Sequence, residues 1–156
     1  MSGGISWILI ALLAVALTVA AVCDWRSRTI PNGLNLGIAL LAIPFWWASG
    51  LHIWPDVALH VGIAFLVFAL FIGAFALGAM GGGDVKMIGA LALWLPPFAV
   101  LELLVVMSIA GGVLTLAMAI PHRITKSAAQ LEVPYGIAIA FAGLWLISER
   151  FLNQFV

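Results

Sequence analysis

Six long apolar segments, separated by short polar breaks, leave this chain of 156 residues few possible folds. A helix of about 20 apolar residues crosses the hydrocarbon core of a bilayer. Backbone polar groups in lipid must be bonded internally, as they are in a helix. The sequence therefore predicts an all-α polytopic membrane protein with six transmembrane helices. The expected helices are Ile5–Cys23, Leu34–Ser49, Val57–Ala79, Val85–Leu95, Phe98–Ile120 and Pro134–Leu152.

Composition supports a single membrane domain and argues against several other classes. The chain is 65% hydrophobic and 8% charged, whereas soluble domains are about a quarter charged. Its formal net charge is zero, so we expect no nucleic-acid partner. One cysteine, Cys23, excludes an internal disulfide. We expect residues 1–156 to form one membrane-embedded domain, with a retained first helix and no separate soluble domain.

The distribution of Lys and Arg predicts how the helices are oriented. The first break contains Arg26 and Arg28, Lys86 follows the third, and the fifth contains Arg123 and Lys126. The second and fourth breaks contain neither residue type. Only Arg150, near the end of the sequence, goes the other way. The odd breaks should therefore face the cytoplasm, with both termini outside.

The fourth apolar segment is too short to cross a bilayer. Val85–Leu95 would reach roughly 16 Å as a helix, about half the hydrocarbon thickness. It follows the stretch GAMGGGD, residues 78–84. Irregular backbone at membrane depth is tolerated where it lines a wet cavity or is buried in protein. We therefore expect the glycine turn to be sunk into the membrane beside a water-accessible cleft.

Two aspartates are the candidates for chemistry, because an ionisable residue inside a membrane is a functional hypothesis by default. Asp24 ends the first segment and Asp84 ends the glycine turn, so both should lie at similar depth. Two carboxyl groups side by side share one proton, as in aspartic proteases. The ionised one can activate water while the neutral one donates a proton to a substrate carbonyl. The alternative is that each aspartate caps a helix end.

The neighbouring residues suggest how a substrate could bind. Gly81, Gly82 and Gly83 lack a Cβ, so a substrate strand could approach their backbone closely. Lys86 is either a cytoplasmic anchor that reaches the headgroups or a residue that tunes the aspartates. The three histidines are scattered and suggest no metal site. Hydrolysis by two carboxyl groups needs no cofactor, and we expect none.

Three motifs in this order resemble the prepilin peptidase family, whose members are membrane aspartic proteases with a GxGD sequence. GGGDVKMIGALALWL begins at Gly81 and contains the glycine–aspartate motif. DWRSRTIPNGLN begins at Asp24 and resembles the first aspartate with its Ile-Pro-Asn. VPYGIAIAFAG begins at Val133 and resembles the opening of the last helix.

The resemblance implies a GxGD-type aspartic endopeptidase with Asp24 and Asp84 as the catalytic pair. The implied substrate is a prepilin or pseudopilin with a short basic leader and an apolar helix. The partners would be this precursor, the lipid bilayer and other pilus assembly components. The chain resembles the short form found with tight-adherence (Flp-type) pili, which implies a bacterial inner-membrane protein. Neither a methyltransferase domain nor product methylation is expected of it. The candidate substrate-binding residues are Gly81, Gly82, Gly83, Lys86, Pro31, Asn32, Pro134, Tyr135 and Gly136.

Two other classes of function fit the same residues. A small transporter or proton-relay subunit would use both carboxyl groups without needing glycines before Asp84. A structural subunit of a secretion machine would tolerate replacement of both aspartates. Cleavage of a prepilin by the purified protein separates the peptidase from both.

Overall fold

The computed structural model describes residues 3–124 and 133–152, which form six α-helices and one short π-helical turn. Each helix overlaps one of the six expected apolar segments, so the all-helical prediction is confirmed. In chain order, the elements are α1 (Gly3–Ser27), α2 (Asn32–Ala48), η1 (Ile53–Val57), α3 (Ala58–Ala76), α4 (Gly82–Ala92), α5 (Pro97–Ile124) and α6 (Tyr135–Leu152).

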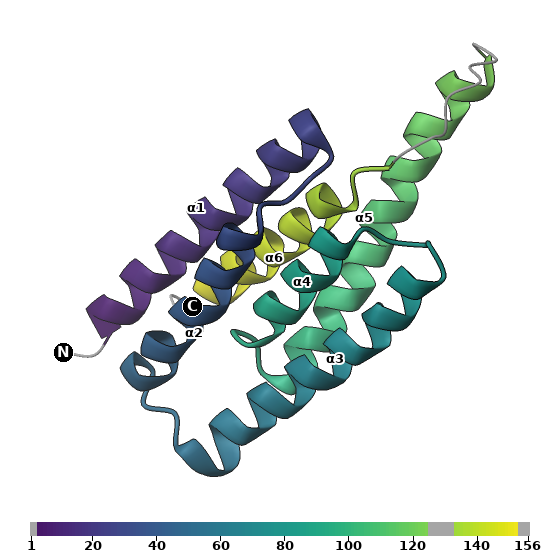
Figure 1. Ribbon diagram of the computed structural model, residues 1–156. Coiled ribbons are helices and arrows are strands. Elements are labelled where there is room, and N and C mark those ends of the chain that lie inside the picture. The colour runs from purple at the N-terminus through teal and green to yellow at the C-terminus, as the bar shows by residue number, and fades with distance from the viewer. Residues whose placement is uncertain (1–2, 125–132, 153–156) are drawn as a thin grey trace.

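Successive helices run up and down along the molecule (Figure 1). The end of α1, the start of α2, the start of α4 and the start of α6 therefore meet at one end. The α2–α3 and α4–α5 connections lie at the opposite end. This alternation brings the first and third polar breaks together, as the distribution of basic residues requires.

The short helix α4 is packed inside the protein. It contacts α2, α3 and α6, while α6 also contacts α1 and α5. Within α4, every residue is buried except Gly82, Gly83 and Lys86. The fourth segment is thus covered by protein on nearly all sides, which removes the need for it to span the bilayer alone. The helix begins at Gly82, before Asp84. The expectation that the glycines form a non-helical turn is therefore wrong for Gly82 and Gly83.

A row of side-chain hydrogen bonds fixes α2 against α4. At one end, Asn35 Nδ2 donates to the Gly83 carbonyl at 2.9 Å and Lys86 Nζ donates to Asn32 Oδ1 at 2.8 Å. Farther along, Trp94 Nε1 donates to the Ile38 carbonyl at 2.9 Å. Trp46 Nε1 donates to the Leu93 carbonyl at 2.8 Å. Directional bonds at both ends of the contact prevent α4 from sliding along α2.

The outer faces of the long helices are apolar. Exposed large side chains include Ile8 and Val15 on α1, Phe65 and Leu66 on α3, and Leu101 on α5. Among the described helices, three are long and apolar enough to cross a membrane: Gly4–Ser27, Ile53–Ala76 and Pro97–Ala119. The exposed apolar faces and these helices indicate an integral membrane protein.

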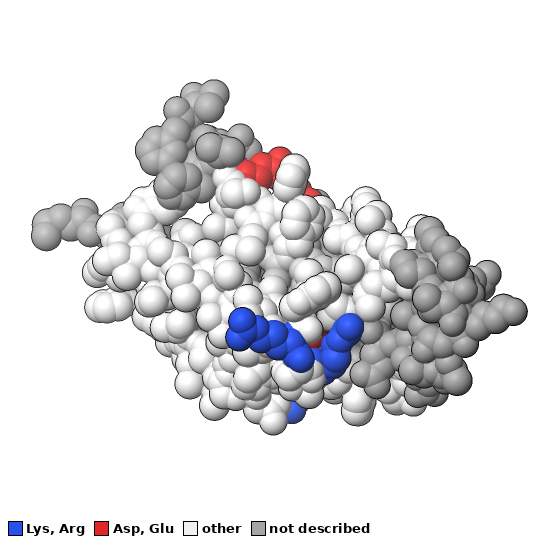
Figure 2. Space-filling model, turned by 90° about the horizontal axis from the view of Figure 1, so that it is seen from above, with Lys and Arg blue, Asp and Glu red and all other residues white. Residues whose placement is uncertain are grey.

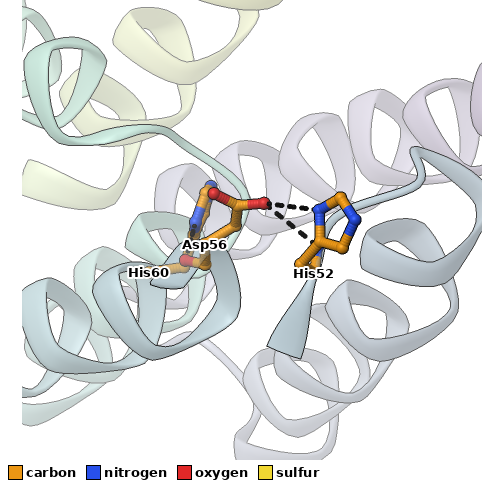
Figure 3. Close-up of polar contacts among 3 residues, drawn as sticks. All are labelled: His52, Asp56 and His60. Atoms are coloured by element: carbon orange, nitrogen blue, oxygen red, sulfur yellow. Dashed lines mark hydrogen bonds and ion pairs between the residues drawn. The ribbon is translucent and has the colours of Figure 1, made fainter. Parts of the chain in front are cut away.

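The end of the molecule away from the α1–α2 connection has its own polar contacts (Figure 3). The His52 backbone N–H donates to Asp56 Oδ2 at 3.0 Å, and His52 Nδ1 lies 3.4 Å from the same oxygen. His60 is buried, and its Nδ1 lies 2.8 Å from the Asp56 carbonyl oxygen. Asp56 therefore closes the η1 turn and provides a control carboxylate on a different connection from both Asp24 and Asp84.

A glycine at the centre of the bundle provides a test of the packing. A Cβ at Gly143 of α6 would lie 2.9 Å from side-chain atoms of both Leu17 and Leu91, which are fully buried. Gly112 of α5 has open space around its Cβ position. Overpacking a closed core costs about 1–3 kcal/mol. We expect Gly143→Leu to lower the thermal midpoint of the purified protein in detergent, with Gly112→Leu unchanged. Equal midpoints for the two variants would contradict the close approach of α1, α4 and α6.

Candidate active site

A polar cavity of about 660 Å³ lies where α1, α4 and α6 meet. Its walls are Asp24 and Arg28 at the end of α1, residues 78–81 with Asp84, and residues 133–135 before α6. Figure 2 looks onto this end and shows basic side chains gathered around a small acidic area. The two sequence-predicted aspartates, 60 positions apart in the chain (84 minus 24), therefore line one cavity.

Asp84 lies in the first turn of α4 and is 8% exposed. Its carboxylate reaches back to the backbone N–H of Gly81, the N-cap residue. This contact is one half of a capping box, in which the side chain of the third helical residue accepts a hydrogen bond from the N–H of the N-cap residue. A Cβ at Gly81 would lie 3.1 Å from Asp84 Oδ2, so this position leaves little room for a side chain.

Asp24 lies in the last turn of α1, is 4% exposed and faces the N-terminus of α6. The backbone N–H groups of Gly136 and Ile137 interact with its carboxylate, as does the charge of Arg28. A helix N-terminus carries a partial positive charge and unbonded N–H groups, so it stabilises an anion. Asp24 Oδ2 is buried and has no hydrogen-bond partner among the described residues.

Ile30 separates the two helix starts that carry these contacts. A Cβ at Gly83 would lie 3.3 Å from Ile30 Cβ, and one at Gly136 would lie 2.7 Å from Ile30 Cδ1. The same Gly136 Cβ would lie 2.8 Å from Asp24 Oδ2. The first turns of α4 and α6 can therefore approach Ile30 and Asp24 this closely only because both positions are glycine.

The electrostatic environment of Asp84 favours its neutral form. Asp84 lies in the first turn of α4, outside the three helices that are long enough to cross the membrane. Burial is the main effect, and the neighbouring Asp24 carboxylate adds to it; together they raise the pKa of Asp84 to about 7. The Gly81 N–H opposes this rise by stabilising the ionised form. At neutral pH, a large share of Asp84 therefore carries a proton.

The structure brings some of the predicted substrate-binding residues to this cavity and separates others from it. Gly81, Pro134 and Tyr135 line the cavity, and Gly136 lies against Asp24. Gly82 and Gly83 are instead covered by Phe75 and Ile30. Their lack of side chains serves helix packing here, and a role in holding substrate stays a prediction.

Two of the three remaining predicted residues line a second, mostly apolar groove. Lys86 and Asn32 are hydrogen-bonded to each other and line a groove of about 530 Å³ between α2, α3 and α4. Pro31 is the exposed N-cap residue of α2. Lys86 is not among the groups that influence Asp84. Its position at the exposed edge of α4 fits the anchor interpretation better than the tuning one.

Sequence reasoning missed three residues of the site. Arg28 was used only to predict the orientation of the helices. It lines the cavity, and its left-handed backbone (φ 55°) follows the end of α1. Ile30 and Asn35 lie in the DWRSRTIPNGLN motif but were given no role of their own, although both are buried beside the start of α4. The available signals were a basic residue four positions after Asp24 and a second amide, three positions after Asn32, in an apolar helix.

Similarity to known proteins places these residues in a family context. The sequence model of the type IV leader peptidase family matches residues 11–116. The chain is 29% identical over 143 residues to the prepilin leader peptidase/N-methyltransferase of Legionella pneumophila. That alignment covers 88% of this chain and 48% of the relative, so the chain spans about half the relative's length. A comparison with solved structures gives no match. The family match covers more than half of the chain and includes both aspartates, and the chain therefore belongs to the type IV leader peptidase family.

Proposed function

We propose that this chain is an aspartic endopeptidase that removes the short basic leader from prepilins or pseudopilins. The observation that carries the proposal is the pair of buried carboxyl groups, from α1 and α4, on one polar cavity. Family membership favours this peptidase over a transporter or proton relay that uses the same residues. The curated relative is named for leader peptidase activity, which supports the same reaction here.

The environments of the two aspartates suggest different roles for them. Asp84 holds a proton near neutral pH, so it is the proposed acid that donates to the carbonyl oxygen of the scissile peptide. Asp24 is the proposed base, because the N–H groups of α6 and the charge of Arg28 offset part of the cost of burying its carboxylate. Asp24 takes a proton from water as the water oxygen attacks the carbonyl carbon. The resulting diol collapses when that proton passes from Asp24 to the leaving nitrogen and Asp84 takes a proton back from a diol hydroxyl. Both carboxyl groups then return to their starting protonation states.

The cavity also suggests how the substrate is presented. Its walls include the connections before α4 and α6, both at the basic end of the molecule. We place this end at the cytoplasmic face of a bacterial inner membrane, where the positive-inside rule puts Arg26, Arg28 and Lys86. The scissile bond would enter from the cytoplasmic side while the apolar helix of the precursor stays in the bilayer. The remaining helices would complete a six-span topology with both termini outside.

The catalytic pair can be tested with neutral substitutions. Asp24→Asn and Asp84→Asn keep side-chain size but remove a proton acceptor or donor. We expect either change to lower the cleavage rate of a matching prepilin by about 100-fold or more. The double variant should be no worse, because groups that act as one unit are not additive. The measurement is single-turnover cleavage at matched amounts of folded protein.

Asp56→Asn is the matched control, because it neutralises an aspartate that lines no part of this cavity. The Asp56→Asn variant should cleave the prepilin at the same rate as the parent protein. If Asp24→Asn or Asp84→Asn also cleaved at the parent rate, the two carboxyl groups would be only helix caps. Separate losses of about 1 kcal/mol of stability for each change would then be expected.

The pKa of Asp84 predicts how activity depends on pH. If Asp84 must be protonated, the active fraction is high below its pKa of about 7 and falls as the pH rises through it. We expect kcat/KM to decline about tenfold per pH unit on the alkaline side. The profile should be measured between pH 6 and 9, with gel filtration to verify that the protein stays folded. A flat profile over that range would assign the acid role to another group.

The proposed orientation is tested by reporter fusions at the short connections. A fusion between Arg28 and Pro31 should report the cytoplasm, and one between Gly50 and His52 should report the opposite side. The reason is that the α1–α2 end carries the described basic side chains of the site, whereas the α2–α3 connection has none. An outside location for the first fusion would move the aspartates away from the cytoplasmic leader.

A further inference from the structure

We propose that Asn35 is a positioning residue that orients the carboxyl group of Asp84. This inference rests on the proposed peptidase function for its kinetic consequence. Asn35 lies near the start of α2, is 4% exposed and donates from Nδ2 to the Gly83 carbonyl at 2.9 Å. It does not line the cavity of the two aspartates. Any effect on chemistry must therefore pass through the backbone of α4.

The Gly83 carbonyl is directly coupled to Asp84. The carbonyl of Gly83 and the N–H of Asp84 belong to one planar peptide unit. A bond that fixes the direction of this carbonyl also fixes the plane from which the Asp84 Cα and side chain project. Gly83 has no side chain to restrict its own dihedral angles. The hydrogen bond from Asn35 therefore adds an external restraint, beyond that of the helix itself, on the residue before the carboxyl group.

Ile30 makes a second contact with Gly83. A Cβ at Gly83 would lie 3.3 Å from Ile30 Cβ, so the Ile30 side chain packs closely against this residue. Ile30 also packs against Gly136, which lies against Asp24. The segment from Ile30 to Asn35 therefore restrains the Gly83–Asp84 peptide at two points and relates it to the Asp24 carboxyl group.

The choice of an amide at position 35 is unfavourable for packing alone. Asn35 Oδ1 is buried and has no hydrogen-bond partner among the described residues. A buried acceptor without a partner destabilises a fold, and asparagine is a weaker helix former than leucine. A leucine of similar size would fill the same space without this cost. Retention of the amide is consistent with a directional requirement at Gly83.

The test compares Asn35→Leu with Trp46→Phe. Each substitution removes one α2 side-chain donor that bonds a backbone carbonyl at one end of α4. The Asn35 bond is at Gly83, in the first turn, and the Trp46 bond is at Leu93, which follows the last turn. We expect Asn35→Leu to lower kcat by about 10–100-fold with little change in KM, since misplacement of a reacting group acts on the chemical step. Trp46→Phe should keep the parent kcat. Asn35→Gln retains the donor, and the adjoining groove of about 530 Å³ has room for its extra methylene. It should recover part of the lost rate.

A spectroscopic measurement makes the test independent of cleavage. Asp24 follows Cys23, Asp56 follows Pro55, and Asp84 alone follows a glycine. Labelling glycine with ¹³C at the carbonyl and aspartate with ¹⁵N therefore gives one correlation, from Gly83–Asp84. Its carbon resonance should move upfield in Asn35→Leu and stay fixed in Trp46→Phe. The Asp84 carboxyl carbon, assigned by its absence in Asp84→Asn, should shift in Asn35→Leu only.

The outcomes separate this inference from the proposed function. A parent protein that does not cleave prepilin overturns the peptidase proposal, while the Asp84 carboxyl shift still tests the positioning. An unchanged Asp84 carboxyl resonance in Asn35→Leu overturns the positioning role even if the parent is active. Equal losses of kcat in Asn35→Leu and Trp46→Phe also overturn it, because they would reflect only the stability of the α2–α4 contact.

Discussion

A helix that is too short for its membrane is the constraint on which this structure depends. With 11 residues, α4 spans roughly 16 Å, about half of the hydrocarbon core. Its ends therefore cannot both reach water across the bilayer, and its polar start must be enclosed by protein or by a wet cavity. The bundle meets this requirement by surrounding α4 with α2, α3 and α6. Burial of the catalytic candidate Asp84 is a direct consequence of that enclosure.

The enclosure depends on small residues at helix contacts. Gly83 meets Ile30, Gly89 meets Phe68, and Gly143 meets Leu17 and Leu91. A methyl group at any of these positions would lie about 3 Å from its neighbour. Close approach between helices in a membrane is favoured by small residues, since the lipid supplies no hydrophobic drive for association. Glycines in this chain thus act mainly through what packs against them, including two of the three that precede Asp84.

Much of the fold could be read from the sequence, because apolar length and polar breaks determine where helices start and stop in a membrane protein. Each of the six expected segments overlaps a helix, and the first and third breaks lie at one end of the described bundle. The aspartate pair was also found, since ionisable residues in apolar surroundings are few. The first turn of α4 was misplaced, because three glycines are a strong turn signal, and the contacts of Phe75 with Gly82 and of Ile30 with Gly83 are tertiary.

The supporting residues could not be predicted for a related reason. Ile30 is one more apolar residue in an apolar chain, and only its contacts with Gly83 and Gly136 give it a role. Asn35 stands close to a second amide, Asn32, in the same motif. Its hydrogen-bond partner is the Gly83 carbonyl, 48 positions away in the chain. Backbone acceptors exist at every residue, so no sequence pattern identifies which one a side chain will reach. Such information becomes available only when the helices are placed.

The interpretations of the two aspartates as helix caps and as an acid–base pair prove compatible. Asp84 serves the N-terminus of its own helix and Asp24 faces the N-terminus of α6. A helix N-terminus stabilises a carboxylate by about 0.3–1 kcal/mol, and up to about 2 kcal/mol when partly buried. Removing an ion from water costs several kcal/mol, so one helix end offsets only part of the penalty. Two neighbouring carboxylates in the same enclosure cannot both be supported in this way. One proton is therefore retained near neutral pH, because burial and the neighbouring Asp24 carboxylate raise the pKa of Asp84 to about 7. The proposed acid–base hydrolysis needs such a mixed protonation state, so it does not conflict with the place of each carboxyl group at a helix end.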